Sequence, residues 1–154
     1  MTWTHHHKRG EILRTVIAVA DQRRDGLLPT DVDGVAQTFV DDLDLLGALQ
    51  LRWHTRLAGH IDRALMEQPM DLEAAVVGAW RRTAREMPGV RAIIDHYRAQ
   101  PADDRMAATL AKALGKEHLT LAVMAGRSGD ADERAIPIGA ELEQRARRAD
   151  LVAA

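Results

Sequence analysis

The seven histidines are the side chains of this sequence best suited to chemistry, because imidazole can bind a metal ion or exchange a proton near neutral pH. Three of them lie beside an acidic residue, each on a different expected helix. A helical bundle could bring such groups together around a transition metal or another histidine-ligated cofactor. The ligand candidates are His54, His60, Asp62, His96, Glu117 and His118.

The spacing of these residues argues against a shared metal site. Di-iron carboxylate bundles use Glu-x-x-His and zinc proteases use His-Glu-x-x-His, and the sequence contains neither pattern. Adjacent residues such as Asp95 and His96 diverge by about 100° around a helix, so one ion does not easily reach both. We therefore expect histidines at the surface or rim, and no metal or other cofactor. The His5–His7 run, whether native or left from cloning, would bind nickel or zinc weakly.

Groups for covalent catalysis or phosphate binding are scarce. The sequence has no cysteine, which removes thiolate nucleophiles, disulfides and thiolate metal sites together. Its single serine, Ser128, falls in an expected flexible loop with no base nearby in sequence. The segment ALGKEH has a Gly-Lys pair but lacks the rest of a Walker motif. We predict no catalytic residues and favour a protein that is not an enzyme.

The elements that would position these residues are all expected to be helices. Apolar residues recur at spacings of three and four along nearly the whole chain, and no long alternation of period two occurs. We predict an all-α, single-domain bundle of about five to six helices over 9–150, with one long central helix, behind a flexible N-terminus over 1–8. The expected helices cover about 8–24, 31–67, 72–87, a short stretch from 88, a stretch from 101 and 139–150. Gly34 can break the second of these near residue 40, and the clearest loop is 125–134.

The leucine-rich stretch from Leu43 to Trp53 is apolar in several directions around its helix. A helix that is apolar all round must be covered all round. Either this helix is central in the domain, or a partner covers its second face. We favour a homodimer, since two-fold dimers are the commonest oligomers. The interface candidates are Leu45, Leu49, Leu51 and Trp53.

Two features suit nucleic-acid binding. Arginines flank two tryptophans, although helical spacing places both rings on apolar stripes. Residues 109–129 resemble a helix-turn-helix with Gly115 near the turn, but Lys116 stands where an apolar residue is usual. The charge of this segment is balanced, whereas DNA-binding proteins present a basic face. A DNA-binding regulator using 106–127 is therefore an alternative, and we do not expect a nucleic-acid partner.

The amino-acid composition limits the possible partners, location and source of the protein. The net charge is -2, which points to neither nucleic acid nor a membrane surface. No uncharged stretch of about 18 residues occurs, and the N-terminus lacks the apolar run of a signal peptide, so we expect a cytoplasmic protein without a membrane span. Many arginines, few lysines and much alanine suggest a GC-rich bacterial genome. The expected function is protein–protein contact as a homodimer, and a ligand- or metal-binding bundle using the histidines is the alternative.

Overall fold

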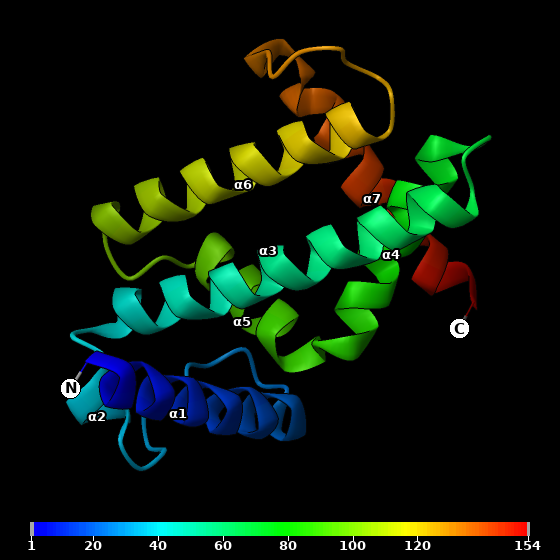
Figure 1. Ribbon diagram of the computed structural model, residues 1–154. Coiled ribbons are helices and arrows are strands. Elements are labelled where there is room, and N and C mark those ends of the chain that lie inside the picture. Colours follow the sequence, from blue (N-terminus) through cyan, green and yellow to red (C-terminus); the bar gives the residue numbers. More distant parts are fainter. Residues whose placement is uncertain (1, 154) are drawn as a thin grey trace. The chain divides into compact units, whose positions relative to one another are not determined.

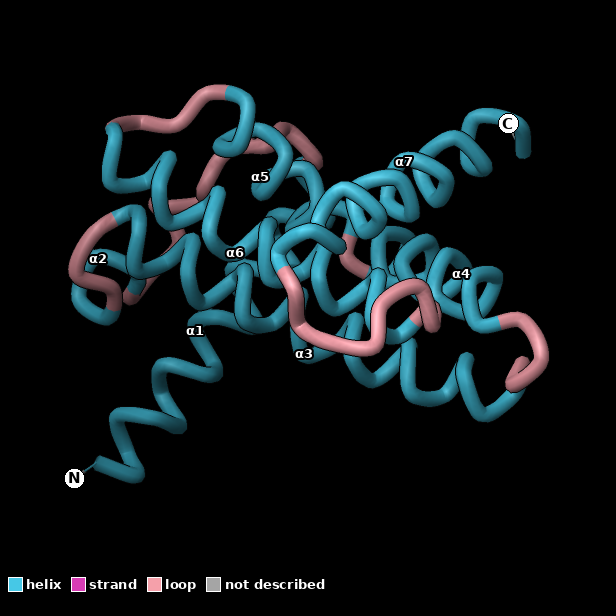
Figure 2. Tube along the Cα trace, turned by 90° about the horizontal axis from the view of Figure 1, so that it is seen from above, coloured by secondary structure: helices cyan, strands magenta, loops and turns pink. Residues whose placement is uncertain are grey.

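The computed structural model describes residues 2–153, and the side chains of 3–148. Its elements are helices joined by loops, with no strand among the described residues, so the all-α prediction is confirmed (Figure 1, Figure 2). In chain order the elements are α1 (Thr2–Arg23), α2 (Val35–Thr38), α3 (Asp42–Glu67), α4 (Leu72–Glu86), α5 (Pro88–Ala99), α6 (Asp104–Met124), the 3-10 helix η1 (Glu133–Ala135) and α7 (Ile136–Ala153).

The helix predicted over 31–67 is broken, as Gly34 allowed. Gly34 adopts the left-handed conformation, with a φ of 91°, directly before the short α2, and the extended backbone of Phe39 then ends α2 before α3 begins. Two aspartates then cap α3. The Asp41 carboxylate accepts from the Asp44 amide at 2.8 Å, and the Asp44 carboxylate accepts from the Val40 amide at 3.0 Å. This arrangement satisfies two amides around the helix start, in the manner of a capping box.

Two helix ends differ from the prediction. α1 begins at Thr2, so residues 2–8, expected to be a flexible terminus, are helical. α7 begins at Ile136, earlier than the predicted residue 139, and buries Leu142 as expected. The side chain of Ala149, assigned to the same apolar face, lies outside the described residues.

α6 runs without a break from Asp104 to Met124, through Gly115. A helix-turn-helix needs a turn between its two helices. Because the chain stays helical at the expected turn, the helix-turn-helix interpretation of 109–129 is wrong. Gly115 is tolerated inside the helix instead.

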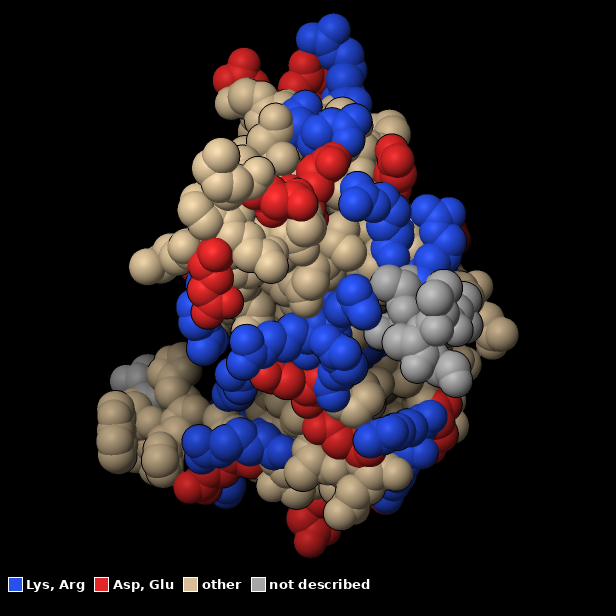
Figure 3. Space-filling view, turned by 90° about the vertical axis from the view of Figure 1, so that its right-hand side faces the viewer, with Lys and Arg blue, Asp and Glu red and all other residues tan. Residues whose placement is uncertain are grey.

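The surface carries charge of both signs. On the face shown in Figure 3, basic and acidic side chains are interspersed. No helix in the described part of the chain has both the length and the apolar character needed to cross a membrane.

The chain divides into two compact units. The first comprises Met1–Trp53 and Met87–Ala107, and the second comprises His54–Glu86 and Ala108–Ala154. The division cuts through α3 and α6, so each of these helices has one part in the first unit and the other part in the second. The single domain predicted over 9–150 stays a prediction.

In the first unit, α1 packs against α5 (Figure 1). The two helices approach so closely that a Cβ added at Gly89 would overlap the backbone of Ala20. The Gly89 amide donates to the Asp21 carboxylate at 2.9 Å, and the Leu28 amide donates to the Tyr97 hydroxyl at 3.3 Å. A glycine at the start of α5 therefore sets the spacing of these two helices.

One face of the leucine-rich part of α3 is buried by the chain itself. Leu45, Leu49 and Trp53 are at most 1% exposed, whereas Leu51 is 67% exposed. The Arg91 guanidinium lies 4.6 Å from the centre of the Trp53 ring and covers one side of it. These three interface candidates are spaced four residues apart, so they lie on one face of α3, and the chain itself covers that face. The other side, which carries Leu51, is not covered within the chain, so the expectation of a helix covered all round is not met here. Leu51 is the candidate that a partner could still contact.

Arg23 at the end of α1 and Asp31 in the following loop form a two-pronged ion pair. Both guanidinium Nη atoms donate to the carboxylate, each at 2.7 Å. These hydrogen bonds hold the pKa of Asp31 down at about 2, from an ordinary value of 3.8. We expect Arg23→Gln to raise the pKa of Asp31 toward 3.8 in an NMR titration of its carboxyl carbon. A pKa that stays near 2 in the variant would contradict this pair.

The same ion pair should contribute little to stability, because both side chains are exposed to water. A carboxyl whose folded-state pKa is lowered stabilises the fold above its unfolded pKa, and that contribution is lost as the pH falls through the folded pKa. The small difference in unfolding free energy between wild type and Arg23→Gln should therefore shrink as the pH is lowered from about 6 to about 2.

Candidate functional site

Most of the predicted ligand candidates fall in the second unit, namely His54, His60, Asp62, Glu117 and His118. His60, Glu117 and His118 are 3%, 5% and 6% exposed, His54 is half-buried and Asp62 is exposed. The sixth candidate, His96, lies half-buried on α5 in the first unit, with its ring edge-on to Tyr97. The prediction of surface or rim histidines is therefore wrong for His60 and His118. Both rings can be buried because each pairs with a carboxylate from another helix.

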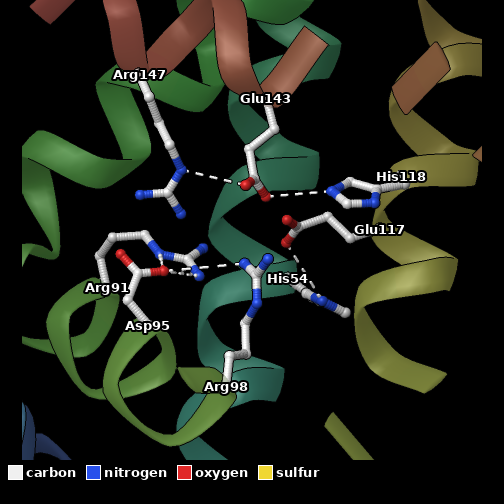
Figure 4. A network of polar contacts seen from close by, with 8 residues as sticks. All are labelled: His54, Arg91, Asp95, Arg98, Glu117, His118, Glu143 and Arg147. Carbon is white, nitrogen blue, oxygen red and sulfur yellow. Dashed lines mark hydrogen bonds and ion pairs between the residues drawn. The ribbon is translucent and has the colours of Figure 1, made fainter. Parts of the chain in front are cut away.

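One buried network centres on the Glu143 carboxylate of α7 (Figure 4). His118 Nε2 on α6 lies 3.3 Å from Oε1, and Arg147 Nε donates to Oε2 at 3.1 Å. The Arg147 guanidinium carbon also lies 4.8 Å from the centre of the Trp80 ring on α4, which is cation–π geometry. A buried carboxylate costs several kcal/mol unless it is paired. Here each carboxylate oxygen has a partner, so the network ties α4, α6 and α7 together.

Gly139 explains how Glu143 reaches His118. A Cβ added at Gly139 would overlap the carbonyl group of His118, so the backbones of α6 and α7 are in direct contact there. Glu143 follows four residues later and lies on the same face of α7. The glycine therefore brings α7 close enough for the Glu143 carboxylate to meet the His118 ring.

A second buried carboxylate, Glu117, borders an open groove between α3 and α6. Glu117 Oε1 lies 3.5 Å from His54 Nε2, and the two side chains are 4% and 31% exposed (Figure 4). The groove has a volume of about 210 Å³. It is lined by His54, Leu57, Ala58, Ile61, Lys116, Glu117 and Thr120. The His54–Glu117 pair therefore borders a space whose walls are mainly hydrocarbon.

His60 on α3 pairs with Glu86 at the end of α4. His60 Nε2 lies 2.8 Å from Glu86 Oε2. This hydrogen bond, with smaller effects from the Arg56 and Arg82 guanidinium groups, holds the pKa of Glu86 below its ordinary value. The second ring nitrogen of His60, Nδ1, is buried and has no hydrogen-bond partner within the described residues.

In the first unit, Asp95 binds two arginines of its own helix, α5 (Figure 4). Arg91 Nη2 donates to Asp95 Oδ1 at 2.8 Å, and Arg98 Nη1 lies 3.9 Å from the same oxygen. Residues three and four apart share a helix face, so this cluster forms locally. It holds Arg91 over the Trp53 ring.

The histidines do not converge on a common centre. Across the part of the chain that the structure describes, no group of three or more His, Asp or Glu side chains is placed to hold a metal ion. Instead, His54, His60 and His118 each pair with one carboxylate.

Sequence reasoning missed the partners of the buried histidines. Glu143 stands beside Leu142 on the apolar side of its helix, and a glutamate in a buried face signals a buried partner. Arg147 follows Glu143 by four residues and could have been paired with it. Glu86 carries no comparable signal, because it stands at the end of its helix among exposed residues.

Comparisons with known protein families, with curated protein sequences and with solved structures find no match to this chain. The function therefore has to be inferred from these side chains and cavities.

Proposed function

We propose that this protein binds a small, largely apolar molecule carrying a hydroxyl group in the groove between α3 and α6. The observation that supports this function is a buried carboxylate, Glu117, at the edge of a groove with apolar walls. Ligand pockets usually have volumes of about 300–1,000 Å³. A groove of about 210 Å³ therefore suits a ligand smaller than a typical drug molecule.

The polar end of the ligand is set by Glu117 and His54. An ionised carboxylate only accepts hydrogen bonds, so the matching ligand group is a donor, either a hydroxyl or an amine. Lys116 also lines the groove, and its positive charge would repel the positive charge of an amine ligand. A neutral alcohol is therefore the better match, with its hydrocarbon part against Leu57 and Ile61.

Binding is a better match than catalysis for this groove. The one hydroxyl side chain in its lining, Thr120, donates to the Lys116 carbonyl of its own helix at 3.0 Å. Ser128, the only serine, lies in a loop and donates to the Asp130 carbonyl at 2.7 Å. Neither hydroxyl has a base as its hydrogen-bond acceptor, which an activated nucleophile requires.

Filling the groove should abolish ligand binding. Ala58 lines the groove and is exposed, so Ala58→Trp places an indole there without entering the core. We expect 1-hexanol to bind the wild type saturably in an NMR titration, and Ala58→Trp to weaken that binding by at least about tenfold. Ala111→Trp is the matched control, because Ala111 is exposed on α6 and does not line the groove.

The role of the carboxylate is tested by Glu117→Gln, which keeps the shape of the side chain and removes its charge. A hydrogen bond to a charged group is stronger than one to a neutral group, so we expect about tenfold weaker binding of 1-hexanol. Hexylamine and hexanoate serve as comparison ligands of opposite charge. Equal affinity of wild type and Ala58→Trp would contradict the site, and a wild type that binds none of the three compounds would remove the proposed function.

Self-association through Leu51 is the second candidate function. Its support is the 67% exposure of this leucine in the leucine-rich part of α3. Light scattering at high protein concentration should then give twice the chain mass of 17.0 kDa for the wild type and a monomer for Leu51→Glu. A monomeric wild type would rule this candidate out. For either function, the cysteine-free composition supports a cytoplasmic setting, and the many arginines and alanines support a bacterial source.

A further inference from the structure

A second groove lies in the second unit, between α3 and α4, and its character is basic. It has a volume of about 350 Å³ and shares no lining residue with the α3–α6 groove. Three arginines and one glutamate line it, namely Arg63, Arg81, Arg82 and Glu67. Arginines therefore outnumber carboxylates in the lining, which suits an anionic ligand.

The floor of this groove is made of very small residues. Ala74, Ala75, Gly78 and Ala79 all come from α4. A Cβ added at Gly78 would meet no atom within 4 Å, so the space above this glycine is open. A ligand can therefore lie directly against the α4 backbone between the arginine side chains.

His60 adds a buried polar atom to the groove lining. The residue is 3% exposed, and its Nε2 is engaged by the Glu86 carboxylate at 2.8 Å. Because a carboxylate only accepts hydrogen bonds, Nε2 carries the proton of that bond. Nδ1 then has a lone pair or, in the imidazolium form, a second N–H, and it has no partner among the described residues. Buried polar atoms in folded proteins are normally satisfied, so the unpartnered Nδ1 of a residue that lines the groove is a candidate contact for a ligand.

Arg63 and Arg82 retain N–H donors for that ligand. Arg63 donates from Nε to the Gly59 carbonyl of its own helix at 3.4 Å, which leaves its terminal nitrogens uninvolved in that bond. Arg82 is more than half exposed and reaches Glu86 from Nε at 3.5 Å. Guanidinium groups present paired N–H donors that fit phosphate oxygens.

We propose that the α3–α4 groove binds a small organic phosphate. Arg63 and Arg82 hold the phosphate oxygens, His60 Nδ1 donates to them when the ring is in its imidazolium form, and the organic part lies over Gly78. A phosphate monoester is favoured over a carboxylate because it offers a second charge and a third oxygen to the guanidinium N–H donors.

The test is a titration with phenyl phosphate, followed by NMR at about 50 mM salt, with benzoate as the singly charged comparison ligand. We expect phenyl phosphate to bind at least about tenfold more tightly than benzoate, and Arg63→Gln to weaken phenyl phosphate binding by about fivefold or more. The Nδ1 resonance of His60 should also shift on saturation. An unchanged Nδ1 resonance would contradict the role given to His60.

Gly78 supplies a matched pair of variants. Gly78→Leu should fill the groove and weaken phenyl phosphate binding by at least about tenfold, whereas Gly78→Ala should weaken it much less, since its added methyl meets no protein atom and takes up little of the groove. Thermal unfolding of both variants shows whether each is folded. A wild type that does not bind phenyl phosphate, or an affinity that is the same in Gly78→Leu and Arg63→Gln as in the wild type, would overturn the proposal. Binding of 1-hexanol in the other groove is a separate measurement, so the two proposals can fail independently.

Discussion

Replacing Leu49 with glutamate should prevent the chain from folding cooperatively. Leu49 is 0% exposed in the middle of α3. Truncation of a buried leucine to alanine alone costs about 2–5 kcal/mol, and an unpaired buried carboxylate costs several kcal/mol more. Domains of this size have unfolding free energies of about 5–15 kcal/mol in total. Circular dichroism during thermal and urea unfolding would show the loss of the cooperative transition.

Leu51→Glu is the matched control for this substitution. Leu51 stands two residues along the same helix and is 67% exposed, so its carboxylate would remain in water. We expect its unfolding free energy to lie within about 0.5 kcal/mol of the wild type. A Leu49→Glu variant that folds normally as a monomer would mean that Leu49 faces a partner and not the interior of its own chain.

Gly139→Ala should have the second largest effect, although it adds one methyl group. The new Cβ would overlap the carbonyl carbon and oxygen of His118, which belong to the backbone and cannot rotate away. The helices α6 and α7 would have to separate, and the Glu143 carboxylate would then lose the His118 ring. We expect a loss of about 3 kcal/mol in unfolding free energy, at the upper end of the usual cost of overpacking. Urea unfolding followed by circular dichroism measures it.

Gly115→Ala provides the comparison, because it makes the same chemical change inside α6. The nearest atom to its added Cβ would be the Ile136 side chain at 3.7 Å, an ordinary contact. Alanine is favoured over glycine in a helix interior by about 1 kcal/mol, so this variant should be more stable than the wild type. If Gly139→Ala were stabilised in the same way, the close contact between α6 and α7 would be wrong.

The helices could be predicted from the sequence because each depends on its own local pattern. The spacing of apolar residues predicted α4 nearly to its ends, and the break expected near residue 40 occurs, although the extended residue there is Phe39 and Gly34 lies before α2. The expectation that Leu43–Trp53 be covered all round is met on the face of Leu45, Leu49 and Trp53, but not at Leu51, which is 67% exposed. The sequence could not tell whether the same chain or a second copy provides the cover, since that depends on how distant segments pack.

The candidate site could be predicted only in part, for the same reason. His54, His60, Glu117 and His118 were singled out from their chemistry, but their partners lie far along the chain. His118 pairs with Glu143 and His60 with Glu86, both about 25 residues away and on other helices. No helical period relates such residues, so the histidines were expected at the surface. The grooves were also beyond prediction, because each depends on two helices and on small residues such as Gly78 at their contact.

The most direct test of the proposed function is a search for intermolecular nuclear Overhauser effects between 1-hexanol and the methyl groups of the α3–α6 groove. The account predicts effects from the hydrocarbon end of the alcohol to the Leu57 and Ile61 methyl groups, and their loss in Ala58→Trp. Contacts confined to methyl groups outside this groove, or no contacts at saturating 1-hexanol, would contradict it.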